Sequence, residues 1–270
     1  THDYENFISS ILLKQTARSC AFAVRSFNVE IARIAEQVSQ KSIGLMRMQF
    51  WDDTLDKCFM NDFKKVPQNP VAIELFNAVK TCKLTKRYLK NLIISRKENL
   101  NSNGFHNLED MEKYCELSVS SVYYLILEGS KIKNLDADHA ASHLGKAQGI
   151  VQQLRNIPHT QKLNFIPVPQ AILTKNNVNH EELLRSRSSK PLSDCVYEVA
   201  SRAYQHLSKS RSLEKKVPPE GRRAFLSAVA IAAYLDKLQK VDYDVFHPRL
   251  KHREWTLLPK IWLASFKNRY

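Results

Sequence analysis

Glycine and long apolar runs are scarce in this chain, and each shortage argues against a class of structure. Only 6 glycines occur in 270 residues, and the alternating β-branched pattern that is typical of strands is nearly absent. No run of about 18 apolar residues occurs, so the sequence predicts no membrane-spanning helix. No signal or Arg/Ser-rich transit segment opens the chain, and Thr1 indicates either a trimmed or a processed start, either of which would have removed a targeting segment.

Paired cysteines are also missing. The 5 cysteines lie singly and form no C-x-x-C pair: Cys20, Cys58, Cys82, Cys115 and Cys195. An odd number without close pairs argues against a disulfide framework and against a structural zinc site. We therefore expect a reducing compartment, with each cysteine acting as a small core residue rather than as a nucleophile.

Acidic side chains are few relative to basic ones, 27 against 41, which gives a net charge of +14. Such an excess attracts nucleic acid, anionic lipid or an acidic protein partner. The chain has no zinc finger, no aromatic RNA-binding strand motif and no basic region leading into heptads, so no nucleic-acid partner is expected. The absence of a glycine-rich phosphate loop and of G-x-S-x-G argues against nucleotide-binding and hydrolase functions.

Apolar residues instead recur at intervals of three and four, which is the spacing of amphipathic helices. The spacing predicts helices over 16–40, 43–58, 70–81, 84–99, 107–127, 181–187, 191–208 and 219–238, another from 136 or 138 to 155, and a short one after Pro259. Asn107, Asn179 and either Asp136 or Asp138 are expected to cap their helices. We therefore expect an all-α single domain over 1–270, on which an aromatic and basic tail, 241–270, is packed.

Five segments, in their order and spacing, carry a resemblance to a known family. They are Phe-Asn-Val-Glu-Ile at 27–31, Arg-Met-Gln-Phe-Trp-Asp-Asp at 47–53, Leu-Glu-Asp-Met-Glu-Lys-Tyr-Cys at 108–115, the small-residue helix with Leu-Gly-x-Ala and Leu-Arg at 144–155, and Phe-Ile-Pro at 165–167. Together they resemble the squalene/phytoene synthase family over nearly the whole length. The resemblance implies an isoprenoid-synthase-like helical bundle.

The resemblance also shows which acids are missing. Family enzymes carry D-x-x-x-D on two facing helices, where each pair holds magnesium on a diphosphate. The corresponding positions here are Ala32 and Glu36 on the first helix, and Asn156 and Thr160 on the second. Because Glu36 alone should hold magnesium weakly, the resemblance implies no catalysis, metal, cofactor or small-molecule substrate.

Three further positions follow from the same motifs. Arg47 and Arg155 fall where the family lines its diphosphate pocket. They either bind an anionic lipid head group or acidic peptide, or pair with Glu30, Glu36 or another buried acid. Tyr123 takes the place of the last glycine of the family's Ala-Gly-x-x-Gly, so it is expected to fill part of the isoprenoid tunnel.

Within the family, the eroded acids, the Met-Gln-Phe-Trp segment and the tail at 243–249 resemble the branch that assists assembly of mitochondrial complex I (NADH dehydrogenase). The resemblance implies a non-catalytic assembly factor in the mitochondrial matrix, peripheral to the inner membrane, with complex I subunits and other assembly factors as partners. Two alternatives remain open: an active head-to-head prenyltransferase using Glu36, Asp52 and Asp56, and a carrier of prenyl diphosphate or anionic lipid.

Two surfaces are candidates for partner or membrane contact. Basic residues at helical spacing indicate either a solvated face or a dock for an acidic subunit: Lys83, Lys86, Arg87, Lys90, Arg96 and Lys97. Trp255 and Trp262, among basic residues of the tail, indicate either a closed core or a surface for anionic membrane or a partner's groove. Three pairs at four-residue spacing are interpreted as helix-surface or structural residues rather than metal ligands: Asp52 and Asp56, Asp194 and Glu198, His139 and His143.

Overall fold

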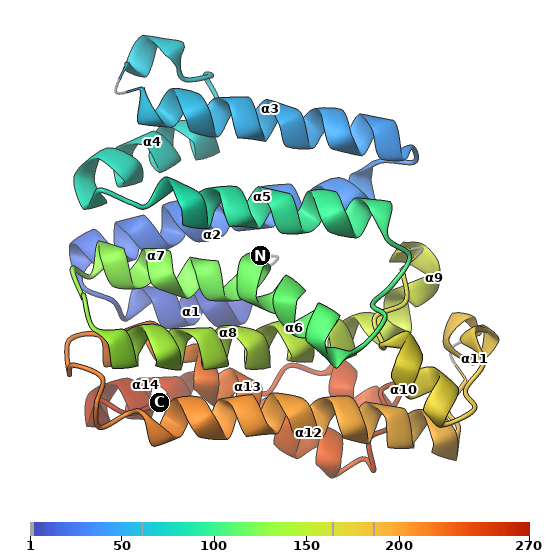
Figure 1. The fold of residues 1–270 in the computed structure, drawn as a ribbon. Coiled ribbons are helices and arrows are strands. Elements are labelled where there is room, and N and C mark those ends of the chain that lie inside the picture. The colour runs from blue at the N-terminus through green and yellow to red at the C-terminus, as the bar shows by residue number, and fades with distance from the viewer. Residues whose placement is uncertain (1–2, 61, 164, 186) are drawn as a thin grey trace.

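The computed structural model describes residues 3–60, 62–163, 165–185 and 187–270, and its regular structure is helical (Figure 1). Within these ranges no strand forms, and a single isolated bridge joins Gly104 to Ile166. The α-helices are α1 (Tyr4–Ile11), α2 (Gln15–Gln37), α3 (Lys41–Phe59), α4 (Pro70–Cys82), α5 (Lys86–Asn101), α6 (Leu108–Cys115), α7 (Ser121–Gly129), α8 (Leu135–Asn156), α9 (Thr160–Leu163), α10 (Gln170–Lys175), α11 (His180–Leu184), α12 (Lys190–Ser212), α13 (Ser227–Gln239) and α14 (Leu257–Lys267). The all-α prediction is confirmed.

Shorter turns connect several of these helices. A π-helical turn, η2 (Glu116–Ser120), joins α6 to α7, so the helix predicted over 107–127 is interrupted. Four 3₁₀ turns are η1 (Phe63–Lys65), η3 (Ile157–His159), η4 (Arg222–Phe225) and η5 (Pro248–Lys251). The helix predicted over 219–238 begins only after η4. The helix predicted over 181–187 ends at Leu184, and Ser186 lies outside the described residues.

Local capping explains many of the helix starts. Asn107 Oδ1 accepts a hydrogen bond from the Asp110 amide at 2.8 Å, and Asn179 forms a capping box with Glu182, so both predicted caps are confirmed. The predicted cap of α8 is wrong, because Asn134 Oδ1 accepts from the Ala137 amide instead. Asp136 and Asp138 lie in the first turn, where negative charge still favours the helix dipole.

Helices α3, α5, α7, α8 and α12 lie one above another in Figure 1, and each contacts the next. The small residues of α8 allow a very close approach to the π turn. A Cβ at Gly145 would lie 2.2 Å from Ser120 Oγ and 2.5 Å from Ser120 Cα. A Cβ at Gly149 would lie 2.5 Å from Cys115 Sγ. Side chain and backbone therefore meet here with no room for a further group.

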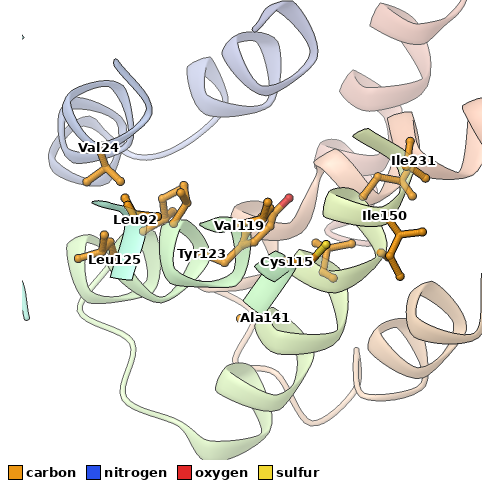
Figure 2. Packing of buried hydrophobic residues seen from close by; sticks show 14 of the residues in the cluster. Val24, Leu92, Cys115, Val119, Tyr123, Leu125, Ala141, Ile150 and Ile231 are labelled. Atoms are coloured by element: carbon orange, nitrogen blue, oxygen red, sulfur yellow. The ribbon is translucent and has the colours of Figure 1, made fainter. Parts of the chain in front are cut away.

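One hydrophobic core extends from Leu13 to Tyr270 and contains most of the buried apolar side chains. Figure 2 shows its centre, where Val24 of α2, Leu92 of α5 and Leu125 of α7 pack together. A second, smaller cluster joins α1, α13 and α14. Four of the cysteines are buried and all five are free thiols, as the sequence predicts. Within the described part of the chain, no helix combines the length and the apolar character needed to cross a bilayer.

Candidate functional site

A cavity of about 370 Å³ opens between α2, α5 and α8. Its lining includes Ala32 and Glu36 of α2 and Asn156 of α8. The structure thus brings together three of the four positions that correspond to the family's aspartates. The fourth, Thr160, is buried and is not part of the lining, since its hydroxyl donates to the Ile157 carbonyl at 2.7 Å.

The donor set of this cavity does not fit a magnesium cluster. The face contributed by α8 carries the amides of Gln152, Gln153 and Asn156 and no carboxylate. Two carboxylates line the cavity, those of Glu36 and Asp3, and two guanidinium groups line it as well. Magnesium bound to a diphosphate needs carboxylate oxygens from both sides, and α8 supplies none. Over the residues that the structure describes, no group of three His, Cys, Asp or Glu side chains is placed to hold a metal ion.

Arg96 of α5 is a buried cation on the cavity wall. The side chain is 8% exposed, and its guanidinium donates to Asn28 Oδ1 at 2.7 Å and to the carbonyls of Leu92 and Ser118 at 3.1 and 3.3 Å. All its partners among the described residues are neutral, and Nε has none. Burial lowers the pKa of Arg96, yet an arginine stays protonated at neutral pH. Arg96 therefore brings a positive charge to the cavity wall without a direct carboxylate partner among the described residues.

The basic spacing of α5 predicts a solvated or docking face that includes Arg96, and this interpretation is wrong because the side chain is buried. The buried face of α5 repeats at 89, 92, 93 and 96, so Arg96 falls on the apolar side of its helix. A charged residue at such a position is a candidate for a buried site.

The two arginines predicted to line the pocket lie elsewhere. Arg155 makes two hydrogen bonds to the Glu5 carboxylate, at 2.8 and 3.0 Å, and its guanidinium lies 4.4 Å from the ring centroid of Tyr234. Arg47 is exposed and donates to Gln37 Oε1 at 3.2 Å. Arg155 thus pairs with an acid, as one of the two predicted roles requires, but the acid is a half-buried residue of α1.

Tyr123, which is expected from the family resemblance to fill part of an isoprenoid tunnel, lies in the core between three helices. It is fully buried, and Figure 2 shows it within the core beside Val119. Its hydroxyl donates to Gln148 Oε1 and shares a hydrogen bond with Ser227 Oγ. Burial raises the pKa of Tyr123, which keeps the hydroxyl protonated. Together with the contact between Ser120 and Gly145, this side chain fills the space between α7, α8 and α13.

The basic residues of α5 are largely engaged with α3. Lys90 Nζ lies 2.6 Å from Asp52 and 2.7 Å from Asp56, and Lys86 lies 3.1 Å from Asp56. The hydrogen bond from Lys90 lowers the pKa of the Asp56 carboxyl. Neither aspartate lines the cavity. Two exposed cations of the predicted basic surface, Lys83 and Arg87, have no ion-pair partner among the described residues.

The other spaced pairs have structural partners. Asp194 and Glu198 pair with Lys190 and Lys175 on the surface. His139 is exposed, whereas His143 Nδ1 lies 2.9 Å from Nδ1 of His206, a partner 63 residues away that sequence reasoning missed. Burial lowers the pKa of His143 to about 4.

The tail presents its tryptophans to solvent. Helix α14 packs through Leu257 and Ile261, while Trp255 is 85% exposed and Trp262 is 61% exposed. These two rings therefore do not close the core.

Comparisons with known proteins agree with this architecture. Residues 1–256 match the family model described as squalene/phytoene synthase. The Bos taurus protein named NADH dehydrogenase (ubiquinone) complex I, assembly factor 6, is 45% identical over 269 residues, which cover 99% of this chain and 80% of that protein. The Homo sapiens protein of the same name is 43% identical over 269 residues, with the same coverage.

A solved structure confirms the predicted fold class. Squalene synthase HpnC from Alicyclobacillus acidocaldarius matches with a TM-score of 0.77 at 20% identity, covering 90% of each chain. The chain belongs to the squalene/phytoene synthase family, in the branch of the relatives named complex I assembly factor 6.

Proposed function

We propose that this protein is a non-catalytic assembly factor for mitochondrial respiratory complex I. It acts by binding complex I subunits and other assembly factors at the matrix side of the inner membrane, to which it is peripheral. A role in complex I assembly is supported by the names of two relatives that are 45% and 43% identical along nearly the whole chain. The observation that carries the loss of catalysis is the face of α8, which offers amides to the cavity and no carboxylate.

The electrostatics of the cavity support a binding role. A departing diphosphate carries about three negative charges, and divalent cations normally neutralise them. Glu36 stands alone among the positions of the four family aspartates, and across the cavity it faces the neutral Asn156. Tyr123 is fully buried and Gly145 is tightly packed against Ser120, which supports the proposal that an isoprenoid chain has little room between α7, α8 and α13. Both the neutralisation of a departing diphosphate and the space for an isoprenoid chain are thus reduced.

The prenyltransferase alternative has weak support from the geometry. Its three candidate acids do not share a site, because Asp52 and Asp56 are bound by the lysines of α5 while Glu36 lines the cavity. A general acid or metal ligand held in such ion pairs has few free oxygens for a substrate.

The carrier alternative has one specific observation in its favour, which is Arg96. A buried guanidinium without a carboxylate would gain from an anionic group in the cavity. This candidate predicts that pyrophosphate alone, without magnesium, raises the melting temperature of the protein, and that Arg96→Met removes the rise. Unchanged melting of the original protein would reject the carrier function.

Complementation of cells that lack the protein tests the main proposal. Blue-native electrophoresis should show that Glu36→Ala restores mature complex I as well as the unmodified protein does. In parallel, the pure protein should release no diphosphate from farnesyl or geranylgeranyl diphosphate with magnesium. Turnover that Glu36→Ala abolishes, or normal complex I in cells without the protein, would overturn the proposal.

A further inference from the structure

Helix α14 has two apolar faces, and only one of them is covered. Leu257, Ile261 and Ser265 are buried and pack on a cluster formed with α1 and α13. On the other side, Leu258, Trp262 and Phe266 follow one another at intervals of four and are 46%, 61% and 77% exposed. Residues four apart on a helix share a face, so these three side chains form one stripe.

Exposed apolar residues extend the stripe beyond the helix, and two of its rings stack on each other. Trp255, just before α14, is 85% exposed, and Leu263 beside the stripe is 45% exposed. The rings of Trp262 and Phe266 stack with centroids 5.8 Å apart at 14°. We call these five residues the α14 patch: Trp255, Leu258, Trp262, Leu263 and Phe266. Exposed large apolar side chains that gather on one helix face mark a candidate interaction site.

The charge around the patch is strongly positive. Residues 248–270 contain six basic side chains and one acid, Glu254, whose carboxylate is paired with Lys260 at 2.5 Å. The other five basic residues are exposed and form no ion pair among the described residues: Arg249, Lys251, Arg253, Lys267 and Arg269. Lys267 and Arg269 directly follow the stripe along the chain, and an anionic surface complements their charge.

The shape of the patch favours a bilayer over a protein groove. Helix α14 lies at the edge of the bundle beside α13 (Figure 1), and the exposed residues of the stripe are not part of the cluster through which α14 packs on α1 and α13. Tryptophan is enriched at the boundary between lipid tails and head groups, and lysine and arginine reach head groups from there. With 11 residues, the helix has a length of about 16 Å, which suits a position in the plane of the interface.

We propose that the α14 patch binds the protein to an anionic phospholipid bilayer. Trp262 and Phe266 enter the boundary of the acyl region, and Lys267 and Arg269 contact the head groups. The inference rests on the proposed function in one respect, since it names the surface and the lipid charge that make the protein peripheral to the inner membrane.

Vesicle sedimentation of the full chain tests this assignment. The protein should bind vesicles of phosphatidylcholine with about a quarter phosphatidylglycerol, and it should bind neutral phosphatidylcholine vesicles far more weakly. The double variant Trp262→Ser, Phe266→Ser should lose about tenfold or more in binding to the anionic vesicles. Lys267→Glu, Arg269→Glu should lose most of the preference for anionic lipid.

A matched control is available on α3. Met46 and Phe50 are also four residues apart and are 64% and 47% exposed. Met46→Ser, Phe50→Ser should bind vesicles like the unmodified protein. Circular dichroism establishes that each variant is folded, which is expected because all the altered side chains are exposed.

Several results would overturn the lipid assignment. They are no binding to anionic vesicles, equal binding to neutral and anionic vesicles, and an equal loss in the α3 control. If the Trp262→Ser, Phe266→Ser variant keeps vesicle binding but loses protein partners in cells, the patch is a protein dock and the lipid assignment falls. Failure on vesicles with normal restoration of complex I leaves the proposed function intact, whereas failure of the unmodified protein to restore complex I rejects that function whatever the vesicles show.

Discussion

Replacing Gly145 by alanine tests whether the space between α8 and the π turn is fully packed. The Cβ of an alanine would lie 2.5 Å from Cα and 2.6 Å from N of Ser120, as well as 2.2 Å from Oγ. Because two of these atoms belong to the backbone of the π turn, no rotamer change relieves the overlap. Helix α8 and the π turn must move apart, which disturbs Tyr123 and the core around it.

The magnitude follows from two opposing effects. Glycine to alanine inside a helix gains about 1 kcal/mol from helix propensity. Overpacking of a dense core costs about 1–3 kcal/mol, and more where backbone must shift. Since the closest contacts at Gly145 include backbone, we place the overpacking cost at about 3–4 kcal/mol, and after the gain of about 1 kcal/mol the free energy of unfolding should fall by about 2–3 kcal/mol.

Urea unfolding followed by far-UV circular dichroism measures this loss. Gly44→Ala on α3 is the matched control, because its Cβ would meet only side-chain methyl groups of Val38 and Leu100, at 3.2 and 3.3 Å. These can yield, so the control should change the unfolding free energy by less than about 1 kcal/mol. An unfolding midpoint of Gly145→Ala at or above that of the unmodified protein would show that a gap exists between α8 and the π turn, and would refute this close packing.

Three further changes have expected outcomes. Tyr123→Phe should destabilise the protein by about 1–3 kcal/mol in urea unfolding, because Gln148 and Ser227 lose a buried hydrogen-bond partner, and an unchanged midpoint would contradict this network. Burial lowers the pKa of His143 from 6.5 to about 4, so the neutral ring stabilises the folded protein above pH 6.5, and this stabilisation is lost as the pH falls towards 4. In His143→Gln, the free energy of unfolding should therefore change less with pH between 6.5 and 4, by on the order of 2 kcal/mol. Glu5→Gln should weaken the attachment of α1 by about 0.5–1 kcal/mol, seen as faster hydrogen exchange of α1 amides, and equal exchange rates would show that the Arg155 pair is without effect.

The parts of the fold that sequence predicts well depend on local chemistry. Pro70 and Asn69 together define the start of α4, and the Asn107 and Asn179 caps need only the residues that follow them. The π turn between α6 and α7 has no such local mark. Its residues continue the apolar spacing of a regular helix, so sequence predicts one helix over 107–127 where the structure has three pieces.

The site was less predictable because its partners are far apart in sequence. The family motifs identify Ala32, Glu36 and Asn156, and the structure does place these three around one cavity. They do not reveal that Arg155 pairs with Glu5, since the two residues are 150 positions apart and α1 was not predicted. The long side chain of an arginine can reach an acid on another helix, so its ion-pair partner does not follow from the motif in which the residue lies.

The same contrast explains why this cavity tolerates a buried arginine. In a cavity bordered by four aspartates, a nearby guanidinium would be compensated by carboxylates. Here Asn28, a serine hydroxyl and two carbonyl groups accept hydrogen bonds from the terminal nitrogens of Arg96, and these neutral acceptors do not cancel its charge. Arg96 thus has no direct carboxylate partner among the described residues, and the carrier alternative predicts that an anion in the cavity takes that place, although the donor set does not fit magnesium. Loss of catalysis and binding of an anion in this cavity are thus compatible. A catalytic assay by itself therefore does not separate an assembly factor from a carrier, whereas the pyrophosphate melting experiment on Arg96 does.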